Sequence, residues 1–227
     1  MISKKSLLIA VAISLFLSNI SMAVLCARLE AVSAGENHTL ALMDDNTLWA
    51  CGGSNGDYQL GLGGNVYNVP SLQQVKGENG SGYLQNVATF DAGWYHSMAA
   101  DSNGTLWAWG NNTNGQLGGG SGVSYWDVPQ KVHGVDDVGY LSDTVDIVYV
   151  SAGRSGTHSL AVDSNGYVYA WGNNGSGQCG IGSTGGNLLT PYLVLDDDPE
   201  TEDVYLGDVA TIIQAGEGKF WGILFSK

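Results

Sequence analysis

Short runs of β-branched and aromatic residues recur along the chain, and Gly, Asn and Asp separate them. Residues 105–109 and 147–151 are typical of these runs, with a composition that favours strands. The segments Asp101–Gly104 and Asp163–Gly166 each contain Asn-Gly, a pair that adopts the positive φ angles of tight hairpin turns. No stretch keeps a helical period over about ten residues. The pattern predicts an all-β protein built from short strands.

Self-similar blocks occur in the same order three times. Each copy opens with Ala-Gly, continues through a His into an apolar run, turns into an aromatic run that ends in Gly, and then carries Gln in a Gly-rich turn. The copies open at Ala34, Ala92 and Ala152, and a fourth opens at Ala215. A period of about 60 residues with four short strands in each unit indicates that each copy is one propeller blade or one layer of a similar β array. We expect blades over residues of about 29–86, 87–144 and 145–208, with a partial blade over 209–227.

These blocks resemble the repeat of the regulator-of-chromosome-condensation family. Its unit reads roughly A-G-x-x-H-S-L-A-L, a turn, V-Y-x-W-G-x-N, G-Q-L-G-x-G, and then a Pro and a Val. Here the Pro and Val are matched by Pro129 to Val132 and by Pro191 to Val194, and more loosely over 70–75. The resemblance covers residues of about 29–225 and implies β-propeller blades of four short antiparallel strands.

Family members usually close a ring of about seven blades, whereas this length provides about three and a half. We therefore expect an incomplete or half propeller. Three explanations stay open: a truncated gene, a closed ring of about four blades, and self-association of two chains into one ring.

The first 23 residues have the pattern of a secretory signal peptide. Two lysines (4–5) precede an apolar run over 7–17, and small residues flank a cleavage site after Ala23. The apolar run is too short to span a bilayer, which needs about 20 residues, and no later segment is long enough. We expect a signal peptide over 1–23, a propeller repeat domain over 24–227, a secreted or periplasmic location, and no membrane span in the mature chain.

Composition narrows the function classes. The 227 residues include 8 Lys and Arg against 22 Asp and Glu, which gives a net charge of −14. Phosphate contacts need clustered Lys and Arg, so no nucleic acid is expected as a partner. The hydrophobic share of 44% rules out a disordered chain. The three Cys lie at unrelated repeat positions, so no disulfide framework is expected, and Cys51 and Cys179 are interpreted as small core residues.

Three histidines, His38, His96 and His158, recur at one position of the repeat. Equivalent positions on successive blades are separated by the blade spacing, so convergence on one metal ion is not expected. We expect these side chains to hydrogen-bond between a blade and its neighbour. The segment Gly180–Gly185 spells a dinucleotide-binding pattern, but no helix follows it to meet a pyrophosphate. The sequence therefore predicts no catalytic residue, no metal and no cofactor.

Carboxylates gather in two segments. One is the acidic run over 196–203, which lacks the spaced ligands and turn glycine of a calcium loop and is interpreted as solvated. The other lies after the second copy and holds Asp136, Asp137, Asp143 and Asp146. A glycosidase would need two of these groups about 5 to 10 Å apart in a cleft. A glycoside hydrolase is the least favoured interpretation, and the chain is expected not to be an enzyme.

Repeat positions build the scaffold, so functional residues are expected where the copies differ. Between the Ala-Gly and the His of each copy lie variable turn residues that a propeller gathers on one face: Glu36, Asn37, Trp94, Tyr95, Arg154 and Ser155. The longer connections add further aromatic candidates: Tyr125, Trp126, Tyr67 and Tyr83. Exposed Trp and Tyr dominate protein interfaces, although the same rings can instead pack under their own loops.

These observations favour a secreted or periplasmic, non-catalytic protein–protein interaction module with an unidentified protein partner. The family resemblance includes secreted bacterial propellers that inhibit β-lactamases, so an inhibitor role is conceivable. The nucleotide-exchange role of the founding member needs a small GTPase in the cytosol or nucleus, whereas the signal peptide indicates another compartment. The alternative is a carbohydrate-binding or wall-associated, lectin-like protein that uses Trp and Tyr as sugar platforms.

Overall fold

The computed structural model describes residues 27–53, 56–64, 66–153, 157–195, 205, 209–215 and 220–225, with backbone alone in the last two ranges. The expected signal peptide over 1–23 and the acidic run over 196–203 lie outside the described residues. No helix in the described part of the chain is long and apolar enough to cross a membrane.

Three antiparallel sheets of four strands follow one another along the chain, and in each sheet the strands pair in sequence order. The first sheet contains β1 (Leu29–Ala34), β2 (His38–Met43), β3 (Leu48–Gly52) and β4 (Val69–Gln74). The second contains β5 (Val87–Ala92), β6 (His96–Asp101), β7 (Leu106–Asn111) and β8 (Tyr125–Lys131). The third contains β9 (Ile147–Ala152), β10 (His158–Asp163), β11 (Val168–Asn173) and β12 (Asn187–Leu193). A two-stranded sheet of β13 (Val209–Ala215) and β14 (Phe220–Phe225) comes after them.

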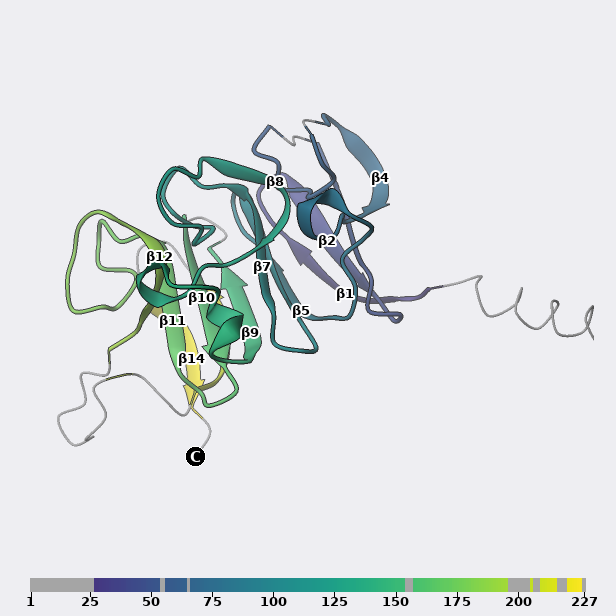
Figure 1. The fold of residues 1–227 in the computed structure, drawn as a ribbon. Coiled ribbons are helices and arrows are strands. Elements are labelled where there is room, and N and C mark those ends of the chain that lie inside the picture. Colours follow the sequence, from purple (N-terminus) through teal and green to yellow (C-terminus); the bar gives the residue numbers. More distant parts are fainter. Residues whose placement is uncertain are drawn as a thin grey trace, which may run out of the picture.

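The sheets stack side by side as blades (Figure 1). The first strand of each later sheet packs against the first two strands of the sheet before it: β5 against β1 and β2, β9 against β5 and β6, and β13 against β9 and β10. The first strands therefore form the inner edge of the array, and β4, β8 and β12 form its outer edge. The predicted all-β architecture, with blades of four short antiparallel strands in an incomplete propeller, is confirmed.

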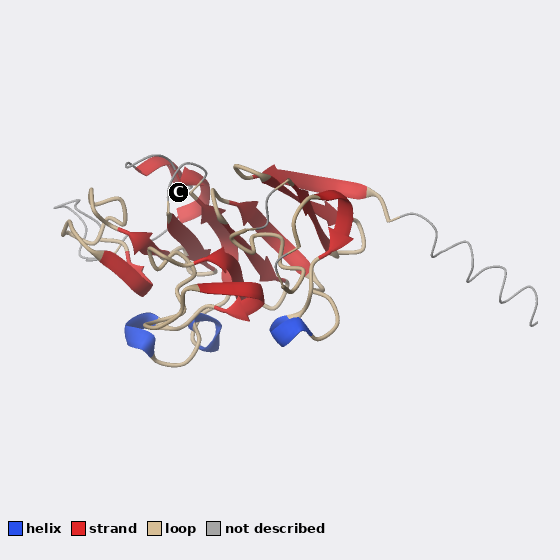
Figure 2. Cartoon of the chain, turned by 90° about the horizontal axis from the view of Figure 1, so that it is seen from above, coloured by secondary structure: helices blue, strands red, loops and turns tan. Residues whose placement is uncertain are grey.

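Three short 3-10 helices follow the outer strands: η1 (Glu78–Gly80), η2 (Val135–Asp137) and η3 (Leu141–Asp143). They lie on one side of the row of sheets (Figure 2), and η1 and η2 contact β8 and β12 of the next blade. The connections after the first and second blades therefore tether the outer edge of the blade that follows.

The hydrophobic core is a series of layers between neighbouring blades. Leu40 and Leu48 of the first blade pack in one layer with Trp109 of the second blade. Met98 of the second blade packs in the next layer with Trp171 of the third. Because the second and third blades have a neighbour on each side, their middle strands have no solvent face, and all six residues of β10 are buried. The apolar runs of these two blades are therefore core on both sides.

Each outer edge strand carries a proline: Pro70 in β4, Pro129 in β8 and Pro191 in β12. An edge strand exposes unpaired N–H groups that can recruit another chain, and proline has no N–H to offer. The Pro of the repeat thus protects the outer edge of each blade against strand addition.

The hairpin turn at 101–104 forms as predicted, with Gly104 N donating to Asp101 O at 2.9 Å. Only the glycine has positive φ, at 78°, so the prediction that Asn-Gly as a pair supplies this conformation was wrong for Asn103. The Asp101 carboxylate instead orders the turn, because its Oδ1 accepts from the backbone N of Asn103 at 2.9 Å and of Thr105 at 3.1 Å. Asp163 repeats this arrangement in the third blade.

The two cysteines of the described residues are free. Cys179 is fully buried in an apolar layer, as predicted for a small core residue, and Cys51 is half-buried. Burial raises the pKa of the Cys179 thiol to about 12, so this side chain stays protonated and unreactive at neutral pH.

Candidate functional site

A hydrogen-bond relay joins each blade to the next at the repeated histidine. His38 Nε2 lies 2.8 Å from Ser97 Oγ of the second blade, and Ser97 Oγ donates to the Gln59 carbonyl of the first blade at 2.8 Å. Trp109 Nε1 donates to the same carbonyl at 2.9 Å. Since Ser97 gives its proton to Gln59, it accepts from His38, which places the imidazole proton on Nε2. The prediction that the histidines link neighbouring blades is confirmed here.

The same relay occurs between the second and third blades. His96 Nε2 lies 2.9 Å from Ser159 Oγ, and both Ser159 Oγ and Trp171 Nε1 donate to the Gln116 carbonyl, at 2.7 and 2.9 Å. The His, Ser, Trp and Gln of the repeat are therefore one structural unit that spans the blade boundary.

The histidines are neutral structural groups. Desolvation by burial lowers the pKa of His96 to about 3, with smaller contributions from His158 and His38, and it lowers the pKa of His38 and of His158 to about 4. Each lies in a different blade, and no three His, Cys, Asp or Glu side chains of the described residues are placed to hold a metal ion.

In the first two blades the imidazole ring requires the glycine three residues before the histidine, Gly35 before His38 and Gly93 before His96. A Cβ on Gly93 would lie 2.6 Å from His96 Cε1, far inside van der Waals contact. We expect Gly93→Ala to lower the free energy of unfolding by about 1–3 kcal/mol, because the ring is buried and cannot move away. Chemical denaturation measures this loss. Gly53→Ala is the matched control, since a Cβ added there would meet no atom within 4 Å, and equal losses in both variants would contradict the assignment.

The candidate interface is the end of the blades at which β2, β6 and β10 begin. His38 pairs with Gly52 and Gly52 with Val69, so the β1–β2 and β3–β4 connections both lie at this end, and the second blade repeats the arrangement. We call it the aromatic face, and among the described residues it is formed by 35–37, 53, 56–64, 66–68, 93–95 and 112–124. The structure brings together there the predicted turn residues Glu36, Asn37, Trp94 and Tyr95. Arg154 and Ser155 lie outside the described residues.

Trp94 and Tyr95 form the aromatic pair of this face. Their rings stack with centroids 5.4 Å apart and an interplanar angle of 24°, and both residues are half-buried. Trp94 N donates to Gly153 O at 3.0 Å, which ties the turn to the third blade. Trp94 Nε1 is buried without a hydrogen-bond partner among the described residues. Glu36 and Asn37, at the equivalent turn of the first blade, are both exposed.

The other predicted aromatics divide between this face and the scaffold. Tyr125 begins β8 at the aromatic face and is exposed, and Tyr67 is also exposed there. Trp126 is half-buried and packs against both interblade layers, so for this ring the packing interpretation holds. Tyr83 lies beyond β4, toward the opposite end of the blades, where Lys76 Nζ lies 4.8 Å from its ring centroid.

Sequence reasoning missed Tyr58. Its ring stacks on Tyr125 with centroids 4.2 Å apart and an interplanar angle of 15°. Tyr58 stands where the other copies of the Gln turn have Gly115 and Gly177, and all three residues have positive φ. The signal was available in the sequence, because a tyrosine at a glycine position of the repeat is a departure of the kind that marks function.

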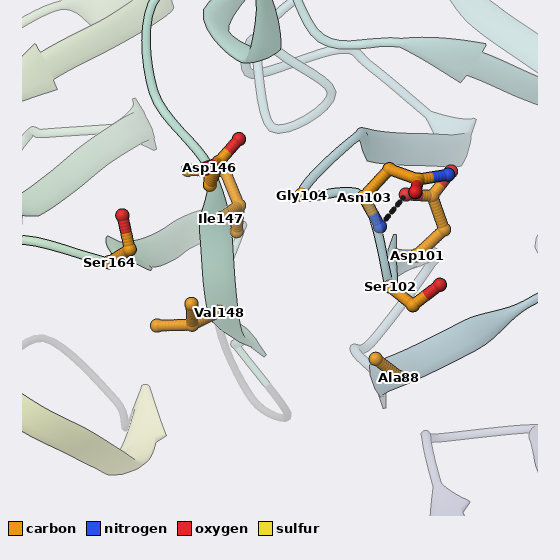
Figure 3. Close-up of a pocket in the computed structure, with 9 residues that line it drawn as sticks. All are labelled: Ala88, Asp101, Ser102, Asn103, Gly104, Asp146, Ile147, Val148 and Ser164. Carbon is orange, nitrogen blue, oxygen red and sulfur yellow. Dashed lines mark hydrogen bonds between the residues drawn. The ribbon is translucent and has the colours of Figure 1, made fainter.

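A pocket of about 380 Å³ lies at the opposite end of the blades, between the second and third (Figure 3). Asp101 and Asn103 line one side of it and Asp146 and Ser164 the other. The Asp101 carboxylate is already engaged by the backbone of its turn, and Asp146 stands across the pocket from it. The lining is mixed, with Ala88, Ile147 and Val148 beside the polar groups, and one of its two carboxylates, that of Asp101, is held by the backbone of its turn.

The remaining aspartates of the glycosidase hypothesis have structural contacts or lie elsewhere. Asp137 Oδ1 lies 2.5 Å from His133 Nδ1, and Asp143 Oδ2 accepts from Tyr140 N at 2.9 Å. Asp136 and Asp137 line a different hollow from Asp146, beside β12. The four residues are therefore not brought into one cleft.

Comparison with known proteins identifies the family. Two family profiles of the regulator of chromosome condensation (RCC1) repeat match the chain, one over residues 45–100, 103–162 and 165–208, the other over 30–59, 87–116 and 147–178. The chain belongs to the RCC1 repeat family. The resemblance found in the sequence is thereby confirmed, and the matches extend through all three complete blades.

Individual relatives are much longer than this chain. The RCC1 domain-containing protein RUG3, mitochondrial, of Arabidopsis thaliana is 30% identical over 86% of this chain and 42% of the relative. The E3 ubiquitin-protein ligase HERC2 of Homo sapiens is 36% identical over 68% of this chain and 3% of the relative. The chain thus spans less than half the length of these curated relatives.

Solved structures show the same fold. Human WBSCR16 superposes with a TM-score of 0.61 at 22% identity, over 75% of this chain and 38% of that one. Prp20p of Saccharomyces cerevisiae, whose structure was described together with its binding properties to Gsp1p and histones, gives a TM-score of 0.61 at 23% identity, over 74% and 39%.

Proposed function

We propose that this chain is a secreted or periplasmic, non-catalytic module that binds another protein through its aromatic face. The observation that carries the proposal is the stacked Trp94–Tyr95 pair, which replaces Glu36-Asn37 of the first blade at the equivalent turn. Membership of a propeller repeat family supports a protein-interaction role, because such repeats present turns on a shared face.

The rings of Trp94 and Tyr95 support a partner that packs apolar groups against them. Both residues are half-buried, so each offers part of its surface to a docked protein, whereas Trp94 Nε1 is buried and out of reach of a partner. Aromatic anchors of this kind carry much of the binding energy in protein interfaces.

The non-catalytic part of the proposal is supported by how the candidate groups are used. His38 and His96 are neutral members of the blade relay, and Asp101, Asp137 and Asp143 are engaged by backbone or His133. The secreted or periplasmic location in the proposal is supported by the sequence pattern of residues 1–23. The two lysines, the apolar run and the small residues of this segment match a signal peptide.

Site-specific photo-crosslinking tests the proposed interface. A photoreactive phenylalanine at position 95 of the full chain, expressed in the native host, is expected to capture a discrete protein. The matched control carries the same residue at Val148, which is exposed at the opposite end of the blades. Capture from position 148 alone, or from neither position, would contradict the proposal.

Self-association is a separate proposal. Leu29 and Val32 of β1 are 60% and 62% exposed on the side of the first blade that no described blade covers. A second copy could cover them. Light scattering of the purified mature chain decides the matter: a monodisperse dimer supports self-association, and a monomer contradicts it.

A further inference from the structure

Three tyrosines gather at the boundary between the first and second blades of the aromatic face. Tyr58 and Tyr125 stack at 4.2 Å, and Tyr67 lies close enough to Tyr58 to affect its ionisation. Tyr125 is 50% exposed and Tyr67 is 61% exposed. We call these three residues the tyrosine cluster. The Trp94–Tyr95 pair that carries the proposed function does not include them.

Tyr58 occupies a backbone position that disfavours it. Its φ is 61°, whereas the equivalent glycines of the other blades have φ of 82° and 80°. A non-glycine residue in this region is strained, and such strain is found mainly where the side chain has a function. The neighbouring Asp57 holds the turn in place by accepting from Asn111 Nδ2 of the second blade at 2.7 Å. The scaffold therefore presents a tyrosine where the repeat would accept glycine without strain.

Carboxylates flank the tyrosine cluster. Asp57 adjoins Tyr58 in the chain, and Asp127 lies close enough to Tyr58 to affect its ionisation while its Oδ2 accepts from Gly64 N at 2.8 Å. Partial burial, then Tyr125, Asp127 and Tyr67, raise the pKa of Tyr58, so its phenol stays neutral and keeps its proton. Neutral electron-rich rings beside carboxylates form a surface that attracts cations.

The described basic side chains lie away from this surface. Arg28, Lys76 and Lys131 all lie toward the opposite end of the strands. Lys76 Nζ lies over the Tyr83 ring, and Lys131 Nζ lies 5.8 Å from the Trp107 centroid and 5.4 Å from that of Tyr140. At the end opposite the aromatic face, lysine side chains therefore lie over aromatic rings, whereas no basic side chain of the described residues lies over the tyrosine cluster.

We propose that the tyrosine cluster receives an arginine side chain of the protein partner, so that the partner presents a basic segment to the aromatic face. A planar guanidinium can stack on the Tyr58–Tyr125 rings while its N–H groups reach Asp57 or Asp127. The inference rests on the proposed function and adds the chemistry of the partner. The flanking carboxylates favour this occupant over a sugar, which would need neither negative charge nor a stacked pair.

Peptide titration calorimetry at low salt tests the inference with the purified mature chain. The probe is an acetylated, amidated peptide of four Gly-Arg repeats, and the same peptide with Gln in place of Arg is its neutral match. Tyr58→Gly is the decisive variant, because it leaves the charge of the protein unchanged and restores the glycine of the repeat. Tyr83→Leu is the control variant, since Tyr83 is an exposed tyrosine outside the cluster.

We expect the Arg peptide to bind the wild type, with affinity lowered at least about fivefold by Tyr58→Gly and by Tyr125→Leu and unchanged by Tyr83→Leu. The melting temperature of Tyr58→Gly should remain close to that of the wild type, because glycine relieves the strained φ as the ring contact is lost. Equal affinities of wild type and Tyr58→Gly, or equal binding of the Gln peptide, would overturn the inference.

Two further results separate the possibilities. If chitohexaose binds and its binding depends on Tyr58 while the Arg peptide does not bind, the cluster is a sugar site and the inference is wrong. If the photoreactive residue at position 95 captures a protein but the affinity of the Arg peptide is the same for the wild type and Tyr58→Gly, the inference fails and the proposed function stands. Peptide binding that depends on Tyr58, without capture at position 95, would refute the proposed function instead.

Discussion

Acidification from pH 8 to pH 5 is expected to destabilise the propeller through its buried histidines. His38, His96 and His158 have folded-state pKa values lowered by desolvation to about 4, 3 and 4, against about 6.5 in an unfolded chain. Below pH 6.5 the unfolded state therefore binds more protons than the folded state, and stability falls as the pH falls toward these values. At pH 5 each histidine contributes a loss of about 2 kcal/mol in the free energy of unfolding.

The physical reason lies in the relay. Each Nε2 proton of His38 and His96 is directed at a serine, and the Nδ1 atoms of all three rings are buried without a hydrogen-bond partner among the described residues. A second proton on Nδ1 would create a buried charge with no acceptor. Proteins with this many buried neutral histidines therefore lose stability in mild acid.

Denaturant titrations at pH 8, 6.5 and 5 measure the effect. The matched variant is His96→Gln, which should be less stable than the wild type at pH 8 but should lose about one third less stability on acidification, since it has two of the three buried imidazoles. The imidazole resonances of His38, His96 and His158 in the wild type should not titrate near pH 6.5. A wild-type stability that is flat between pH 8 and pH 5 would show that the rings are not buried as neutral groups.

Trp109→Ala is expected to lower the free energy of unfolding by about 3–5 kcal/mol. The Trp109 side chain is fully buried in the layer between the first and second blades, and its Nε1 donates to the Gln59 carbonyl. Truncation leaves a cavity between two rigid sheets and removes one member of the relay. Chemical denaturation monitored by circular dichroism measures the loss.

Two comparison variants separate packing from hydrogen bonding. Trp109→Phe keeps most of the volume but loses the bond to Gln59, and should cost about 1 kcal/mol beyond the small change in volume. Cys51→Ala, at the equivalent position of the first blade, should cost less than Trp109→Ala because Cys51 is half-buried. A Trp109→Ala loss no larger than that of Cys51→Ala would contradict the interblade packing described here.

The repeat made much of this fold predictable. The recurrence of Ala-Gly-x-x-His, an aromatic run and a Gln turn set the blades, and the blade spacing alone argued that the three histidines link blades and do not bind one metal. Their serine partners, Ser97 and Ser159, are themselves repeat residues, so the contact repeats wherever two complete copies adjoin.

Features that do not repeat were not predictable. Asp91 joins three blades, accepting from Ser33 Oγ at 2.6 Å and from Ala152 N at 2.9 Å, although the equivalent residues of the neighbouring blades are serines. These partners are about 60 residues distant in sequence and meet only when the blades stack. The stack of Tyr58 on Tyr125 is similar, because it joins the Gln turn of the first blade to the start of β8 in the second, and this pairing could not be predicted even though Tyr58 visibly replaces a glycine of the repeat.

The measurement that tests the central claim most directly is the affinity of the partner captured at position 95 for chains altered on the aromatic face. Trp94→Ala with Tyr95→Ala should weaken binding at least about 30-fold, because the stacked pair is the buried anchor of the interface. Tyr83→Ala, at the other end of the blades, should leave the affinity unchanged. Equal affinity of the wild type and the Trp94/Tyr95 double variant would show that the aromatic face is not the binding surface.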